Sequence, residues 1–151
     1  MKNKIFKTAD SYAPLTIRFI LGLVVFPHGA QKLFGWFGGY GFSGTMDFFM
    51  ETMGLPWLIG FLVIILESFG AIALLAGMAT RIIAGFYLVL ALSIVFTSHI
   101  QHGFFMNWFG NQQGEGYEYF LLWIGMAVSL FLTGGGKYSL DKKLVLKNAV
   151  A

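Results

Sequence analysis

The sequence predicts an all-α integral membrane protein, a four-helix bundle with a short interfacial helix in the first outer loop. Hydrophobic residues make up 57% of the 151 residues, and charged residues make up only 11%. A soluble domain carries about twice that share of charge. Four apolar segments are long enough to cross a bilayer or nearly so, and Lys and Arg flank them on one side only. We treat residues 1–151 as a single transmembrane domain, because no linker, repeat or low-complexity stretch divides them.

The four predicted spans cover residues 14–35, 56–78, 82–98 and 119–133. The last two are short for a hydrocarbon core of about 30 Å, so we expect them to stand nearly upright or to extend into their flanks. The first span follows Lys2, Lys4 and Lys7, as a secretion signal would. It is too long for a signal and no convincing cleavage site follows it, so we expect a retained helix.

The distribution of basic residues predicts the orientation. The two long loops, residues 36–55 and 99–118, contain no Lys or Arg. The basic residues that flank the other side of the spans are Lys2, Lys4, Lys7, Arg81, Lys137, Lys142, Lys143 and Lys147. Because basic flanks stay on the cytoplasmic side, we expect both termini in the cytoplasm and both long loops outside.

A short amphipathic helix is predicted at residues 45–53, inside the first long loop. At helical spacing, one face carries Met46, Phe49, Met50 and Met53, and the opposite face carries Asp47 and Glu51. This pattern is typical of a helix that lies in the membrane interface. Such a helix is either a lid that packs over the bundle or a gate over a site.

Glu67 is the most informative single residue, because it interrupts an otherwise apolar span of residues 57–78. An ionisable side chain at that depth costs a few kcal/mol or more, so it faces a protein interior or a wet cavity and has a partner. Two interpretations stay open. Glu67 is a structural carboxylate paired with Arg18 or Lys32, or it belongs to a site that binds protons, a metal or a polar head group.

Other polar residues fall in the same outer layer of the predicted bundle. His28 and Lys32 are four residues apart on one helix face, and His99 and His102 are three apart on another helix. Arg18 lies on nearly the same face as His28, about 15 Å lower. The resulting candidate polar pocket consists of Arg18, His28, Lys32, Glu67, His99 and Glu118.

This layer supports three hypotheses. His99 and His102, with a carboxylate from another helix, are competent ligands for zinc, iron or copper. Alternatively, His28 or Lys32 donates a hydrogen bond to a quinone whose ring lies against aromatic walls. In the third hypothesis the polar groups only lock the helices together. Because the chain has no cysteine, a redox role requires a bound cofactor or a partner.

Several motifs resemble those of the DoxX family of small bacterial four-helix membrane proteins. They are Arg18, HGAQKLFG at residues 28–35, Glu67 within its apolar span, NWFG at 107–110, GYEY at 116–119 and GGGKYSLD at 134–141. The resemblance implies a bundle related to the small membrane subunit of thiosulfate:quinone oxidoreductase, located in the bacterial inner membrane. It carries no catalytic residue assignment.

Two classes of function therefore stay open. The protein is the membrane component of a quinone-linked redox system, acting as an oxidoreductase subunit with a membrane or periplasmic partner. Alternatively, it is a non-catalytic small transporter or an assembly or scaffold subunit of a membrane complex. We expect contact with the lipid bilayer and no nucleic-acid partner, and the sequence leaves an oligomer open.

Overall fold

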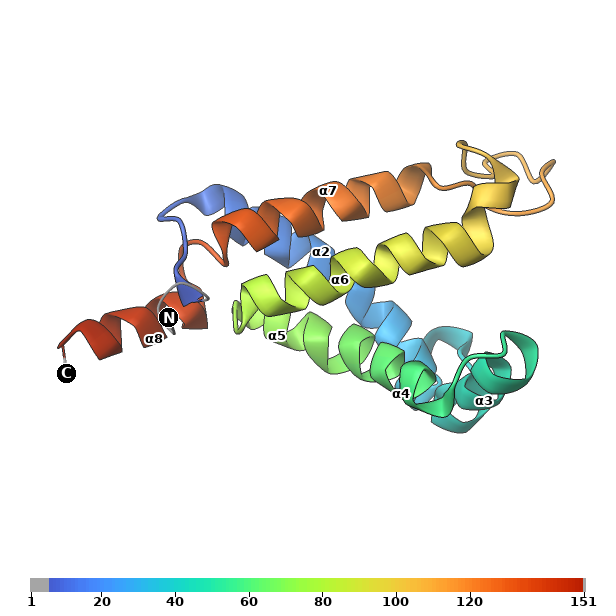
Figure 1. Ribbon diagram of the computed structural model, residues 1–151, viewed down its shortest axis with the longest axis horizontal. Helices are drawn as coiled ribbons and strands as arrows, with labels where there is room; N and C mark the ends of the chain where they lie inside the picture. The colour runs from blue at the N-terminus through green and yellow to red at the C-terminus, as the bar shows by residue number, and fades with distance from the viewer. Residues whose placement is uncertain (1–5, 151) are drawn as a thin grey trace.

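The computed structural model describes residues 6–150, and side chains up to residue 145. All regular structure in this range is helical, as predicted (Figure 1). The basic residues Lys2 and Lys4 and the side chain of Lys147 lie outside the described part.

The first span is α2 (Tyr12–Phe34), a helix of 23 residues. Its start is fixed by Ser11, whose hydroxyl oxygen accepts a hydrogen bond from the Ala13 amide at 3.2 Å. It ends at Gly35, where the backbone turns left-handed at φ +73° and the amide bonds back to the last turn. At about 1.5 Å per residue this helix is long enough to cross the bilayer core.

The second and third spans are each a continuous helix interrupted by a π-turn. The second consists of α4 (Trp57–Ile65), the π-turn η3 (Leu66–Gly70) and α5 (Ala71–Ala76). The third consists of α6 (Thr80–Ile94), the π-turn η4 (Val95–His99) and the 3-10 turn η5 (Ile100–His102). The third therefore extends four residues beyond the predicted end, because residues 99–102, three of them polar, continue the helix.

The fourth span is α7 (Glu118–Thr133), which has 16 residues and is the shortest of the four. A last helix, α8 (Leu140–Val150), follows a tight connection and projects from the end of the bundle that carries both termini. The turn between α5 and α6 lies at this same end (Figure 1). Lys7, Arg81 and the lysines of the α7–α8 region are therefore gathered at one end, away from the two long loops.

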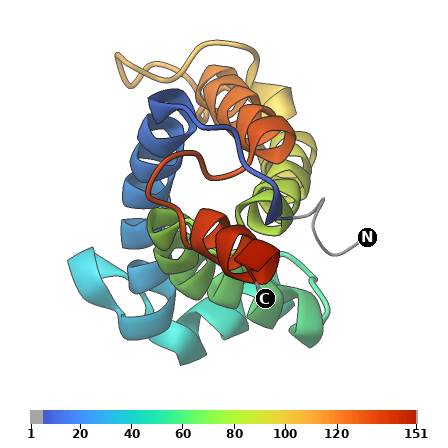
Figure 2. The same ribbon diagram turned by 90° about the vertical axis from the view of Figure 1, so that its left-hand side faces the viewer.

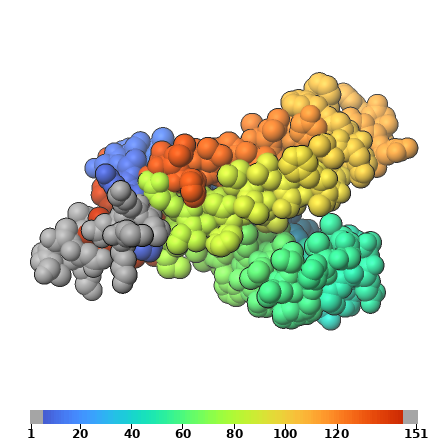
Figure 3. All heavy atoms as spheres, in the orientation of Figure 1, coloured from blue at the N-terminus to red at the C-terminus, as the bar shows by residue number. Residues whose placement is uncertain are grey.

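The spans pack as two pairs, α6 against α7 and α2 against η3 and α5. Between them lies a core of mostly aliphatic and aromatic side chains, which includes Leu21, Leu74, Tyr87, Trp123 and Leu130. Toward the loop end the two pairs separate, and the space-filling view shows a hollow between them (Figure 3). Many large apolar side chains point outward along the spans, as expected for a surface in contact with lipid.

The short helix in the first long loop is present but starts earlier than predicted. It consists of α3 (Gly41–Asp47) and the π-turn η2 (Phe48–Thr52), preceded by the 3-10 turn η1 (Trp36–Gly38). Met46 and Phe49 are buried against Ile64 of α4, as the predicted apolar face required. Met50 and Met53 are exposed instead, because the wider π-turn changes the helical spacing after Asp47.

Candidate functional site

A buried ion pair joins the first and second spans. Glu67 in η3 is only 3% exposed, and its Oε2 lies 2.5 Å from Nζ of Lys32, near the end of α2. The side chain of Lys32 remains 24% exposed, whereas that of Glu67 is 4% exposed. The pair therefore has one end enclosed between helices and one end that water or a ligand can reach. This agrees with the expectation that Glu67 has a cationic partner.

Two features of the backbone place Glu67 there. The π-turn η3 widens the helix, so that Glu67 and its neighbour Ser68 are both buried. Gly29 lets α2 approach closely, since a Cβ at that position would lie 2.4 Å from the backbone of Glu67. The Ser68 hydroxyl donates a hydrogen bond to the Gly29 carbonyl at 3.1 Å. The two helices are thus held backbone to backbone next to the ion pair.

An aromatic cluster from the other two spans borders this region. Trp123 of α7 packs against Tyr87 of α6, Phe120 and Tyr119, with ring centroids 5.7, 6.1 and 6.3 Å away. The Tyr87 hydroxyl donates to the Leu66 carbonyl in η3 at 3.2 Å. Through Tyr87, this cluster of α6 and α7 therefore borders η3, the π-turn that carries Glu67.

Sequence reasoning did not single out Tyr87 and Trp123. The signal was present, because a tyrosine or tryptophan inside an apolar span carries one polar atom that needs a partner when buried. Tyr87 has its partner in η3. The indole nitrogen of Trp123 is buried and has no hydrogen-bond partner within the described part of the chain.

A pocket of about 280 Å³ opens beside Lys32 at the loop end of the bundle. Its walls come from the end of α2, the glycines at the end of η1, and the short helix α3–η2. The lining residues are Gln31, Lys32, Gly38, Gly39, Tyr40, Thr45, Phe48 and Phe49. Thr45, Phe48 and Phe49 belong to the segment predicted as a lid or gate. Lys32 thus takes part both in the ion pair and in an open pocket with aromatic walls.

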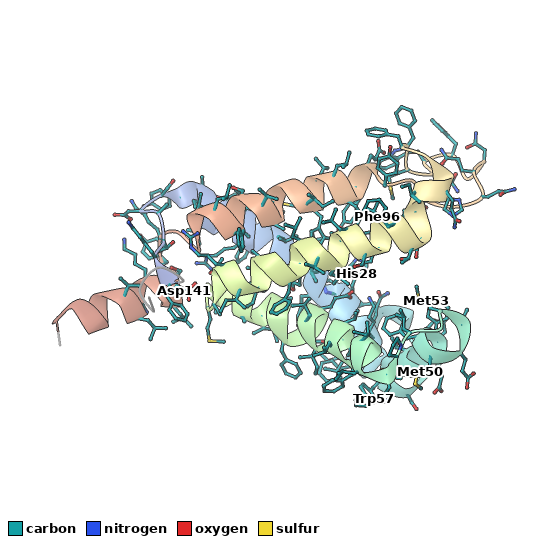
Figure 4. The ribbon with its side chains drawn as sticks, viewed as in Figure 1. His28, Met50, Met53, Trp57, Phe96 and Asp141 are labelled. Atoms are coloured by element: carbon teal, nitrogen blue, oxygen red, sulfur yellow. The ribbon has the colours of Figure 1, made fainter. Side chains whose placement is uncertain are left out.

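The other candidate residues are distributed differently. His28 is exposed on α2, one turn before Lys32, and the eight described residues that line the pocket do not include it (Figure 4). The ring of His99 packs on Phe120 at 4.7 Å, and its Nδ1 lies 2.7 Å from the Glu115 carbonyl oxygen. Both contacts fasten the second long loop to the bundle.

Glu118 also serves this loop. Its Oε1 accepts hydrogen bonds from the Met106 amide at 3.1 Å and from the Trp108 indole at 3.0 Å. The Glu118 amide donates to the Phe104 carbonyl at 2.9 Å. Glu118 and His99 are thus bonded to residues 103–117, and neither forms a hydrogen bond or ion pair with Lys32 or Glu67.

Arg18 lies at the opposite end of the bundle from the pocket. Its guanidinium donates to the carbonyls of Leu74 and Leu75 at the end of α5, and to those of Gly135 and Lys137 in the α7–α8 connection. The last carbonyls of a helix carry partial negative charge, so a buried cation is well placed there. Arg18 ties three segments together and does not contact Glu67.

In the described part of the chain, no third ligand accompanies His99 and His102 in a possible metal site. Within residues 6–150, no group of three or more His, Asp or Glu side chains is placed to hold a metal ion. Nε2 of His102 lies 3.3 Å from the side-chain amide of Gln101, and its ring covers Gly114. Both histidines thus have local partners in the second loop.

Comparison with known proteins now decides the family. The DoxX family model matches residues 13–100, more than half of the sequence. The chain belongs to the DoxX family. This confirms the resemblance seen in the first helix and in the surroundings of Glu67. The match includes the first three spans, with Arg18, His28, Lys32, Glu67 and His99, whereas Glu118 lies outside it.

Two relatives give further information. The chain is 28% identical over 127 residues to "Putative oxidoreductase CatD" of Bacillus subtilis (strain 168), covering 84% of this chain and 83% of the relative. It is 32% identical over 115 residues to "Inner membrane protein YqjF" of Escherichia coli (strain K12), covering 73% of this chain and 79% of the relative. No solved structure matches the sequence. The protein is thus a bacterial membrane protein of the DoxX type.

Proposed function

We propose that this DoxX protein acts as a single membrane domain that binds a quinone and forms the membrane component of a redox system. The observation that carries the proposal is that Lys32 belongs both to the ion pair and to the pocket lining. Its ammonium group is held by the buried carboxylate of Glu67, and its side chain also lines a pocket of about 280 Å³ with aromatic walls. A hydrogen-bond donor in an apolar pocket is suited to a ligand with a ring and carbonyl oxygens.

In this proposal each residue has a distinct task. Lys32 donates a hydrogen bond to one carbonyl oxygen of the quinone, while Glu67 holds the ammonium group in position. Phe48 and Phe49 offer aromatic faces to the ring. Reduction to the quinol takes two electrons and two protons, and the open mouth of the pocket gives access to protons from water.

A partner protein supplies the electrons, because the chain has no cysteine and therefore neither a dithiol nor a Cys-ligated cluster of its own. The name of the relative "Putative oxidoreductase CatD" supports a redox role. We further propose that both termini face the cytoplasm, since Lys7, Arg81 and the lysines of the α7–α8 region lie at their end, whereas the two long loops contain no Lys or Arg. The pocket then opens toward the outer leaflet of the inner membrane.

The experiment is a calorimetric titration, in which a water-soluble quinone analogue is added to the purified protein in detergent and the binding affinity is measured. Replacing Lys32 by Ala removes the donor, so binding should weaken by about 1 to 3 kcal/mol, or roughly five- to more than a hundred-fold. His28→Ala is the matched control. It removes a polar side chain one turn away on the same helix, outside the pocket lining, and should leave the affinity unchanged.

Removal of Lys32 also leaves Glu67 unpaired, so the double variant Lys32→Met/Glu67→Gln is titrated beside it. This variant leaves no unpaired charge at the former ion pair and should still bind the analogue weakly. If the folded Lys32→Ala protein binds as tightly as the parent, or if the parent does not bind at all, the pocket is not a quinone site. That result would favour the interpretation of the protein as a transporter or a scaffold subunit.

A further inference from the structure

A second pocket, unrelated to the proposed quinone site, lies at the end of the bundle that carries both termini. Its volume is about 340 Å³. Its walls come from the segment just before α2, the end of the α7–α8 connection and the first turn of α8. These three segments lie at the end of the bundle that faces the viewer in Figure 2. The lining residues are Asp10, Lys137, Tyr138, Ser139, Lys142 and Lys143. Three ammonium groups and one carboxylate leave this pocket with an excess of positive charge.

The frame that carries these lysines is fixed by buried hydrogen bonds. Asp141, which is 2% exposed, accepts hydrogen bonds from the amides of Ala79 and Thr80 at 2.7 and 2.8 Å. These contacts attach the start of α8 to the α5–α6 turn (Figure 4). The fully buried Ser139 accepts a hydrogen bond from the Lys142 amide at 3.2 Å. The first turn of α8 therefore presents its lysines from a rigid support.

Two of the three ammonium groups are also held in place. Nζ of Lys142 lies 2.8 Å from the Asp10 carboxylate, and this contact holds the pKa of Asp10 below its ordinary value. Nζ of Lys137 lies 4.1 Å from the centre of the Tyr12 ring. Lys143 is exposed at the edge of the pocket. The positive charges thus surround the pocket from different sides.

The pocket lies at the depth where lipid head groups are expected. It adjoins the first residue of α2, where the membrane span begins. Tyr12 and Tyr138 are 56% and 73% exposed, with ring centroids 6.3 Å apart. Exposed tyrosines at a helix end are typical of the membrane–water interface. A ligand bound here would have its charged group between the lysines and its apolar part beside the outer surface of the helices.

We propose that this pocket binds a phosphate group, supplied by the head group of an anionic glycerophospholipid. Lysine ammonium groups bind phosphate as compact point charges, and basic pockets at the ends of membrane helices hold anionic lipid head groups. A volume of 340 Å³ has room for a head group but not for a whole lipid. Lipid binding would strengthen the junction between α2, α8 and the α5–α6 turn.

The test is native mass spectrometry of the full chain in detergent micelles, titrated with phosphatidylglycerol or with phosphatidylcholine. The parent protein should bind phosphatidylglycerol at least about tenfold more tightly. Lys143→Gln should weaken that binding by about fivefold, and Lys137→Gln/Lys143→Gln by about twentyfold, with phosphatidylcholine unaffected. Lys143 is exposed, so the single variant keeps the fold. Lys7→Gln is the matched control, since it removes the same charge from the same end outside the pocket lining.

Three outcomes would overturn the proposal. The first is equal affinity of the parent protein for the two lipids. The second is an equal loss of affinity in Lys7→Gln and in the double variant, which would indicate a diffuse charge effect without a site. The third is displacement of phosphatidylglycerol by inorganic phosphate at low concentration, which would replace the lipid by soluble phosphate as the ligand.

Discussion

Replacing one member of the Lys32–Glu67 pair should destabilise the protein, and the two members should differ. Lys32→Met leaves a carboxylate whose side chain is 4% exposed, whereas Glu67→Gln leaves an ammonium group on a side chain that is 24% exposed. Water reaches the second group through the pocket beside Lys32, but it hardly reaches the first. The enclosed charge without a partner is therefore the more costly one.

The magnitude follows from this difference in exposure. Breaking a buried ion pair by removing one partner costs about 3 to 5 kcal/mol. We place Lys32→Met near the upper value and Glu67→Gln near the lower one. In a chain of this length, 1 kcal/mol corresponds to roughly 2 to 4 °C in melting temperature. The expected decreases are roughly 10 to 20 °C for Lys32→Met and roughly 6 to 12 °C for Glu67→Gln.

Thermal unfolding in detergent, followed by circular dichroism, measures both values. The double variant Lys32→Met/Glu67→Gln tests the mechanism, because it removes both charges and should melt at a higher temperature than Lys32→Met alone. Single variants that melt within roughly 2 °C of the parent would refute a tight buried pair. Additive losses in the double variant would show that the two residues act independently.

Three further predictions concern packing, orientation and a surface contact. Gly29→Ala should lower the free energy of unfolding by about 1 to 3 kcal/mol, since its Cβ would lie 2.4 Å from the backbone of η3; Gly125→Ala, which meets nothing within 4 Å, is the control in the same melting experiment. An alkaline-phosphatase fusion after Gly136 should be inactive if that end is cytoplasmic, and an active fusion would invert the orientation. Lys142 should hold the pKa of Asp10 below 3.8, so this contact stabilises the fold above that pH and is lost as the pH falls through the lowered pKa. An NMR titration that finds the same Asp10 pKa in the parent and in Lys142→Gln would contradict this contact.

The spans, the family and the burial of Glu67 were predictable because each rests on a signal within one segment. The bilayer makes every apolar run and every isolated charge informative by itself. The choice between Arg18 and Lys32 as the partner of Glu67 could not be made in that way. It depends on side-chain direction, since helical side chains lean toward the N-terminal end of their helix. Lys32 therefore leans into the bundle, whereas Arg18 leans toward the terminal end.

The hydrogen-bond partners of His99 and Glu118 could not be predicted from the sequence, for a related reason. Shared depth in the membrane brought His99 and Glu118 into one layer with Lys32, but depth does not say which way a loop folds. In the structure these two residues hold residues 103–117 together. The apolar pattern of the sequence also did not predict the π-turns. The π-turn that begins at Phe48 places Met50 and Met53 on the exposed side of the short helix.

The carboxylate of Asp141 has a consequence for biogenesis. It caps the first amides of α6, yet it is separated from them by some sixty residues of chain. During synthesis the second and third spans enter the membrane before residue 141 leaves the ribosome. The turn between them therefore stays uncapped until residue 141 has been made and has emerged. We expect the helices to insert one after another and the bundle to become tight only when the last helix docks.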